Sequence, residues 1–162
     1  MNTSVARQIA RQTGLAVREA RVVGSQHGYQ HLMISLAGGQ RAFAKVANQE
    51  QASPAEIGAA FAAEASGLRW LAEADAVPVP EVLAVTGTAL VISMIPPGRA
   101  TPSAAFGFGA ELARLHAAGA AGFGAPWRGF IASLPLDNTP GPPGWPQLSD
   151  VRRSLQPPPS HA

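Results

Sequence analysis

The sequence predicts an α+β fold, in which one long helix lies beside an antiparallel sheet of five strands. Short, partly alternating apolar segments run over Ala20–Val23, Gln30–Leu36 and Arg41–Val46, as expected for strands with one covered face. The last two segments are joined by Ala37-Gly38-Gly39-Gln40, a strong hairpin signal because glycine readily adopts the backbone angles of tight turns. These segments are predicted to be the first three strands.

Two helices are predicted to flank these strands. The first covers Ser4–Gly14, an amphipathic pattern that ends at a glycine. The second begins at Ser53-Pro54-Ala55-Glu56, where Ser53 is placed to cap the helix and Glu56 completes a capping box. This helix is expected to continue to about Ala74.

The remaining two strands of the sheet are predicted after that helix. Pro78 and Pro80 end the helical pattern, and Val82–Val85 and Ala89–Met94 are apolar segments joined by Thr86-Gly87-Thr88. The sheet therefore has five predicted strands, and the helix that carries Glu64 connects the third strand to the fourth.

The later part of the chain is predicted to be less regular. Pro96-Pro97-Gly98 forms a linker, and helical periodicity returns over Pro102–Ala118. From Gly122 the chain is rich in glycine and proline, so we expect an ordered loop anchored by large side chains rather than regular elements. The predicted division is 1–95, 96–155 and a disordered tail at 156–162.

Composition excludes several classes of function. The chain of 162 residues has no cysteine, which excludes disulfides, thiolate metal sites and cysteine nucleophiles. Its 12 basic and 10 acidic residues are spread along the chain, without a basic run for nucleic acid. The sequence contains no run of about 18 apolar residues, the length that a membrane-spanning helix needs. We expect a cytoplasmic protein with neither a nucleic-acid nor a membrane partner.

Lys45 is the only lysine in the chain, beside eleven arginines. It ends the third predicted strand and shares a face with Arg41 and Phe43. A compact ammonium group differs chemically from a guanidinium group, and a phosphate-binding position is one place where the difference matters. The alternative is a solvated lysine on the surface of the strand.

Glu64 interrupts the apolar stripe of the second helix. The inward positions follow helical spacing and are Ile57, Phe61, Glu64, Leu68 and Leu71. A carboxylate on a covered face is costly unless it is paired, so we predict an ion pair between Glu64 and Lys45. If Glu64 instead points to the flank of the helix, it is hydrated and needs no partner.

A strand lysine paired with a helix glutamate is part of the phosphate-binding apparatus of protein kinases. Such a fold also places a loop over the phosphates, and Gly24, Ser25 and Gly28 lie between the first two predicted strands. The spacing is not the full Gly-x-Gly-x-x-Gly pattern, and an ordinary hairpin loop would also explain it.

In combination these segments resemble the fructosamine kinase (ketosamine-3-kinase) family, within the aminoglycoside phosphotransferase and protein-kinase-like superfamily. The resemblance covers about Val22 to Trp145, and its strongest part is Glu64–Leu68 followed by Val79–Leu83. It is carried by Val23–Tyr29, Phe43–Val46, Phe61–Leu68, Val79–Leu83, Leu90–Ile95, Gly109–His116, Phe123-Gly124 and Phe130–Thr139, with Trp145 as a further match.

The resemblance implies the N-terminal lobe of a kinase over 1–95, followed by the hinge and first helix of a C-terminal lobe. ATP is the implied cofactor, with Mg²⁺. Its phosphates would lie near Lys45, Glu64 and the segment from Gly24 to Gly28. Ser93, Met94 and Ile95 would form the hinge that receives the adenine, and Ser93 stands where the family usually has glutamate. An intact relative would phosphorylate a ketosamine-type small molecule or a glycated protein.

The family's catalytic motifs are missing from this sequence. Phosphoryl transfer requires a carboxylate near the acceptor and residues that hold magnesium. The family supplies these on a His-Gly-Asp-type loop and an Asp-Pro-type motif, and neither occurs here. We therefore predict no catalytic residue and no metal ligand, and expect a truncated kinase that is inactive alone. The alternatives are a non-catalytic nucleotide-binding or protein-interaction domain, and a complete kinase with an unrecognised base.

Overall fold

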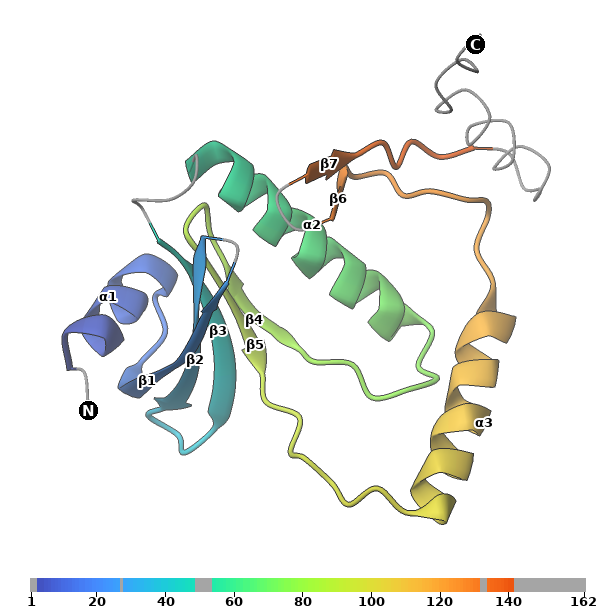
Figure 1. Ribbon diagram of the computed structural model, residues 1–162, viewed down its shortest axis with the longest axis horizontal. Coiled ribbons are helices and arrows are strands. Elements are labelled where there is room, and N and C mark those ends of the chain that lie inside the picture. Colours follow the sequence, from blue (N-terminus) through green and yellow to red (C-terminus); the bar gives the residue numbers. More distant parts are fainter. Residues whose placement is uncertain (1–2, 27, 49–53, 132–133, 142–162) are drawn as a thin grey trace, which may run out of the picture.

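The computed structural model describes residues 3–26, 28–48, 54–131 and 134–141. Its main sheet has five antiparallel strands in the order β1-β2-β3-β5-β4, and a second sheet pairs β6 with β7 (Figure 1). The elements in chain order are α1 (Thr3–Thr13), β1 (Val17–Gln26), β2 (Tyr29–Leu36), β3 (Arg41–Ala47), α2 (Pro54–Glu73), β4 (Val82–Val85), β5 (Ala89–Ser93), α3 (Pro102–Ala118), β6 (Gly129–Ile131) and β7 (Leu134–Leu136). The predicted five-stranded sheet and glutamate-bearing helix are therefore confirmed.

Several predictions concern parts of the chain outside the described residues. These are the Ser53 cap of α2, the match at Trp145 and the tail at 156–162. Among the described residues, no helix combines the length and the apolar character needed to cross a membrane.

Strand β1 is longer than the sequence predicts. It begins at Val17 and continues through Gly24 and Ser25 to Gln26, where the prediction ended the strand at Val23. A register shift between Val22 and Gly24 lets the strand pass an irregular position and resume pairing. Gly24 and Ser25 therefore lie in a strand, and the predicted loop is reduced to a tight turn at Gly28, whose φ is 80°.

The two faces of the main sheet support separate clusters of buried side chains. One cluster joins α1 to four strands, and the other joins α2 to β3 and β5. On β5 the neighbours Leu90 and Val91 belong to different clusters, because successive side chains of a strand point to opposite faces. The α1 cluster is Ala6, Ile9, Ala20, Leu32, Ile34, Ala42, Ala44, Val46, Ala89 and Val91, and the α2 cluster is Ala47, Ile57, Phe61, Ala65 and Leu90.

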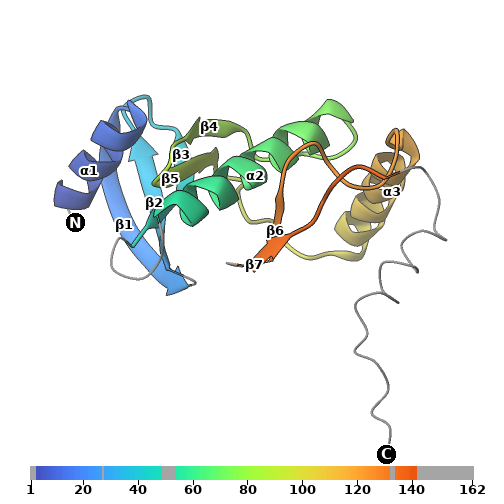
Figure 2. The ribbon, with the colours of Figure 1, turned by 90° about the horizontal axis from the view of Figure 1, so that it is seen from above.

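Helix α2 covers the sheet with only part of its length. Ile57, Phe61 and Ala65 are buried, whereas Leu71, which the helical spacing placed inward, is 37% exposed. The C-terminal part of α2 extends past the edge of the sheet (Figures 1 and 2), so no strand is available to cover Leu71. The inward prediction is therefore wrong for Leu71.

Helix α3 has the predicted bounds, with local signals at both ends. The hydroxyl of Thr101 accepts a hydrogen bond from the backbone N–H of Ala104, at 3.1 Å, and Pro102 occupies the first turn. The helix ends before Gly119, whose φ of 69° suits glycine. No residue of α3 is buried.

The segment after α3 is more regular than predicted. Instead of a loop alone it contains the short hairpin of β6 and β7. Strands of three residues are too short to show an alternating pattern, and Pro135 cannot donate a backbone hydrogen bond within β7. The prediction of no regular element in this segment is therefore wrong.

Candidate functional site

Lys45 and Glu64 form the predicted ion pair. The Nζ of Lys45 donates to both Oε1 and Oε2 of Glu64, at 2.7 Å in each case. Strand alternation directs Lys45 toward α2 because its neighbours Ala44 and Val46 pack on the opposite face. Glu64 lies beside the buried Ala65, one turn after Phe61, and this places its carboxylate over the end of β3.

The pair is partly exposed rather than buried. The side chain of Lys45 is 25% exposed and that of Glu64 is 36% exposed. Two ionised groups that remain in contact with water contribute about 1 kcal/mol or less to stability. The pair is therefore better suited to hold an ammonium group in place than to stabilise the fold, and both side chains line a cavity that can admit an anion.

A cavity of about 560 Å³ surrounds the pair. Three parts of the chain form its walls: the β1–β2 hairpin, helix α2, and the start of the β6–β7 hairpin. The lining residues are Gln26, Tyr29, His31, Lys45, Ala60, Phe61, Ala63, Glu64, Trp127, Gly129 and Phe130. Such a site can take a negatively charged group at Lys45 and pack an uncharged part of a ligand against the aromatic side chains.

Tyr29 and His31 are lining residues that the sequence analysis did not identify. His31 is the register partner of Lys45 on the neighbouring strand, and its ring lies 5.7 Å from that of Phe43. The ring of Tyr29 packs 5.3 Å from that of Phe61. Burial raises the pKa of Tyr29, and the negative charge of Glu64 raises it further. The sequence signal that could have identified both residues is strand alternation. His31 pairs with Lys45, and Tyr29, two residues earlier on β2, points to the same face.

Trp127 and Phe130 carried no sequence signal for this site. They lie far from Lys45 along the chain, in a segment whose short strands were not predicted. Both views of the ribbon place β6 next to α2 (Figures 1 and 2). Only the folded chain brings these side chains to the cavity.

The three predicted phosphate-loop residues do not line this cavity. Gly24 and Ser25 are paired in β1 with His31 and Gln30, and Gly28 forms the turn. The hydroxyl of Ser25 donates to the carbonyl oxygen of Tyr29, at 3.1 Å, which closes the hairpin. The neighbouring Gln26 is the β1 residue that reaches the cavity.

The predicted hinge residues lie farther along β5. Ser93 is the register partner of Ala42, three positions from Lys45 on β3. Its backbone N–H donates to the carbonyl of Glu81 at 2.8 Å, and its hydroxyl accepts from the N–H of Glu81 at 2.9 Å. The N–H of Met94 donates to the carbonyl of Arg41, and Ile95 is 48% exposed. These residues join the sheet to the segment that leads to α3.

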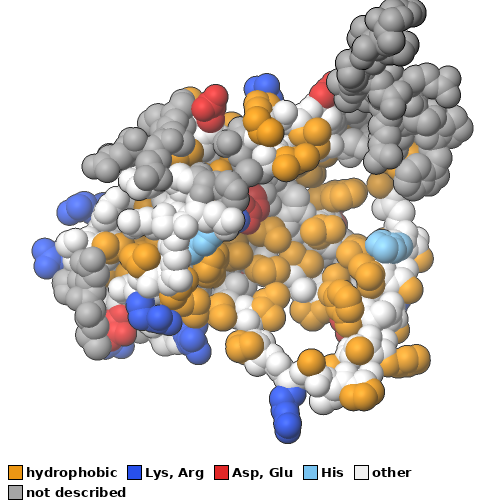
Figure 3. Space-filling view, in the orientation of Figure 1, with side chains coloured by type: hydrophobic (Ala, Val, Ile, Leu, Met, Phe, Trp, Pro, Cys, Tyr) orange, Lys and Arg blue, Asp and Glu red, His pale blue; other side chains and the backbone are white. Residues whose placement is uncertain are grey.

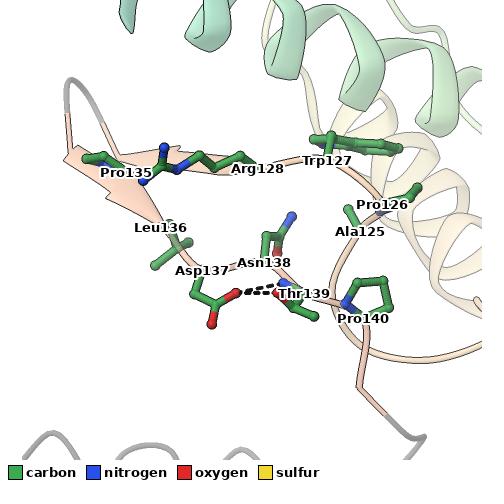
Figure 4. A pocket seen from close by; sticks show the side chains of 10 residues that line it. All are labelled: Ala125, Pro126, Trp127, Arg128, Pro135, Leu136, Asp137, Asn138, Thr139 and Pro140. Carbon is green, nitrogen blue, oxygen red and sulfur yellow. Dashed lines mark hydrogen bonds between the residues drawn. The ribbon is translucent and has the colours of Figure 1, made fainter.

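A second cavity, of about 470 Å³, lies in the loop that carries β6 and β7 (Figure 4). Asp137 accepts hydrogen bonds from the N–H and the hydroxyl of Thr139, at 3.0 and 2.6 Å. These bonds lower the pKa of Asp137. The carboxylate is thus engaged in shaping the turn, and Trp127 lines this cavity as well as the one at Lys45.

Titratable side chains do not gather into a metal site in the part of the chain that the structure describes. No group of three or more His, Asp or Glu residues there has the proximity that a metal ion requires.

Comparison with known proteins identifies the family. The family model described as fructosamine kinase matches residues 1–146 of the chain. The chain belongs to the fructosamine kinase family. A search of curated proteins gave no match.

Two solved structures of this family resemble the protein over most of its length. A Thermobifida fusca protein described as a fructosamine-3-kinase is 32% identical, with a TM-score of 0.79 over 97% of this chain. A Haemophilus somnus protein with the same description is 20% identical, with a TM-score of 0.63 over 85% of this chain, and supports the fold alone. This chain spans 57% of the first protein and 47% of the second. The fold is therefore that of the N-terminal region of the fructosamine kinase structures.

Proposed function

We propose that this member of the fructosamine kinase family binds ATP in the cavity at Lys45 and Glu64, and does not transfer phosphate by itself. The observation that carries the proposal is the bidentate contact from Lys45 to Glu64 at the edge of an open cavity. In kinases such a lysine contacts the nucleotide phosphates, and the glutamate orients it. The position of the pair on β3 and α2 and the family membership both support this assignment.

In the proposed complex each part of the site has a different task. Lys45 keeps one ammonium proton free of Glu64 and donates it to a phosphate oxygen. Gly24, Ser25 and Gly28 act indirectly, because they form the end of β1 and the turn that bring Gln26 to the cavity, where it faces the phosphates. The backbone of Ser93–Ile95 accepts the adenine. Magnesium would neutralise phosphate charge when bound. Because the sequence lacks the family's catalytic motifs, we assign neither a magnesium ligand nor a catalytic base to this chain.

The proposed role in the family is phosphorylation of a sugar-amine adduct. A fructosamine kinase that contains this region together with the missing motifs would use the bound ATP to phosphorylate a ketosamine-type small molecule or a glycated protein. We expect no phosphorylation of a fructosamine or ribulosamine by this chain alone. Formation of the phosphorylated product by the isolated chain would overturn that part of the proposal.

The nucleotide site is tested by titrating the protein with Mg-ATP while its thermal unfolding is followed. Binding to the native state raises the melting temperature, and Lys45→Ala should abolish that rise. Arg18→Ala is the control because it removes a positive charge from an exposed position on β1, and it should respond as the parent does. If millimolar Mg-ATP leaves the melting temperature of the parent protein unchanged, the proposal is wrong.

One observation favours a second function, as a protein-interaction domain. Helix α3 exposes 82% of Phe106 and 58% of Phe108, and exposed aromatic side chains are common where proteins associate. This function requires no nucleotide. It is favoured if Mg-ATP has no effect and if Phe106→Ala abolishes association of the chain with another protein.

A further inference from the structure

The β6–β7 hairpin forms one wall of the cavity that contains Lys45. Trp127, Gly129 and Phe130 line the cavity opposite the residues of the β1–β2 hairpin. Helix α2 and β6 lie side by side in two perpendicular views (Figures 1 and 2). A segment beyond α3 thus closes a site whose charged residues belong to the main sheet and α2.

Trp127 is one of the points at which this segment contacts α2. Its ring meets that of Trp70 edge to face, with ring centroids 6.4 Å apart and an interplanar angle of 70°. Aromatic pairs in this geometry contribute about 0.5–1.5 kcal/mol beyond the burial of their area. Trp70 lies on α2 after Glu64, so the contact links the wall to the helix that positions the carboxylate.

The base of the hairpin is closed by backbone contacts that leave little freedom. The N–H of Ala125 donates to the carbonyl of Asn138, at 2.7 Å. Gly124 has a φ of 92°, and a Cβ there would lie 2.7 Å from the carbonyl oxygens of both Asn138 and Thr139. Trp127 therefore extends from a closed turn, which holds β6 at a defined distance from α2.

The wall affects how strongly Lys45 attracts an anion. Attraction between charges increases as water is excluded, because the effective dielectric constant falls. With the wall in place the side chain of Lys45 is 25% exposed. Without Phe130 and Gly129 against the cavity, water would reach the ammonium group and weaken its attraction for phosphate.

We propose that Trp127 is a positioning residue of the nucleotide site, which acts by packing on Trp70 and holding Phe130 against the cavity at Lys45. The inference rests on the proposed function, because ATP is the ligand whose affinity it concerns. It assigns to Trp127 and Phe130 a part in nucleotide binding that neither Lys45 nor Glu64 supplies.

The test measures the dissociation constant for Mg-ATP by calorimetry. Trp127→Ala should weaken binding about tenfold, and Trp70→Ala should do the same because it removes the other half of the contact. Trp127→Phe should restore most of the affinity, since it keeps an aromatic edge against Trp70. Phe106→Ala, which deletes an exposed aromatic ring on α3, is the control and should bind as the parent does.

A second readout needs no nucleotide. Tyr29 is the only tyrosine in the chain and lines the same cavity as Trp127. Its pKa is raised chiefly by burial, so opening the wall should lower that pKa toward its ordinary value. A role of Trp127 confined to the outer loop would leave the titration of Tyr29 unchanged.

The outcomes separate this inference from the proposed function. If the parent binds no Mg-ATP, both are wrong. If the parent binds and Trp127→Ala and Trp70→Ala bind equally well, only the inference is wrong. Weakened binding in both alanine variants, rescue by Trp127→Phe and a lowered pKa of Tyr29 would together support it.

Discussion

The main sheet with its two covering helices and the segment that begins at α3 differ in how they bury apolar side chains. Every buried hydrophobic residue among those described lies between Ala6 and Val91. Helix α3 has no buried residue, and Ile131 and Leu134 of the small hairpin are more than half exposed. Hydrophobic side chains line the hollow between the sheet and α3 (Figure 3). The first region therefore holds its own core, and the second presents its apolar side chains to solvent.

This difference indicates where the two regions obtain their stability. In the sheet region each buried side chain packs against residues from several strands and a helix, so removing one weakens the packing between these elements. Helix α3 is stabilised by its own backbone, by the cap at Thr101, and by a hydrogen bond from Arg114 Nη2 to the carbonyl of Ala76, at 3.4 Å. The solved relatives are longer than this chain, which spans 57% of one and 47% of the other.

The largest contrast is expected between two phenylalanines. Phe61 is 1% exposed and Phe106 is 82% exposed. Phe61→Ala should lower the free energy of unfolding by about 3–5 kcal/mol, because it leaves a cavity between α2 and the sheet. Phe106→Ala is the matched control and should change it by about 0.5 kcal/mol or less. Urea denaturation followed by circular dichroism measures both, and equal losses would show that α3 has a core of its own.

An intermediate, local effect is expected at Gly124. Its φ of 92° and the close carbonyls of Asn138 and Thr139 exclude a side chain, so Gly124→Ala should destabilise the closed turn by about 1–3 kcal/mol. The N–H of Ala125 should then exchange with solvent faster, while amides of the main sheet exchange as before. Gly141→Ala is the control, because a Cβ there meets nothing within 4 Å. Faster exchange across β3 would contradict the separation of the two regions.

The smallest effect concerns Tyr29 at high pH. Burial, and then the charge of Glu64, raise its pKa above the ordinary value of 10.0. The phenol therefore keeps its proton to a higher pH in the folded state than in the unfolded state. Its stabilising contribution is complete below the unfolded pKa and is lost as the pH rises through the folded pKa. Ultraviolet titration of this single tyrosine measures the folded value directly.

A charge variant tests the cause of that shift. Glu64→Gln should lower the pKa of Tyr29 only part of the way toward 10.0, because burial is the larger cause. Glu73→Gln, on the exposed end of the same helix, should leave it unchanged. A full return to the ordinary pKa in Glu64→Gln would mean that charge, rather than burial, dominates at this position.

Much of the sheet region could be predicted because its signals are local or repeated. Glycine turns and alternating segments placed four of the strands within a few residues of their bounds, and Pro54 marked the start of α2. The pair of Lys45 and Glu64 was predicted because the only lysine of the chain and a glutamate within an apolar helical stripe are both unusual, and a contact between them accounts for both. Where the sequence reasoning was wrong, at Leu71 and in the loop expected at Gly24, the outcome depended on the extent of a neighbouring strand.

By itself, the sequence determined the ion pair at the centre of the candidate site. A single lysine on a strand and a glutamate within an apolar helical stripe follow from composition and spacing. Only the tertiary structure decided what encloses them. The wall formed by Trp127 and Phe130 arises when the β6–β7 hairpin packs on α2. Periodic patterns in a sequence reflect local structure, so they do not indicate contacts between side chains far apart along the chain.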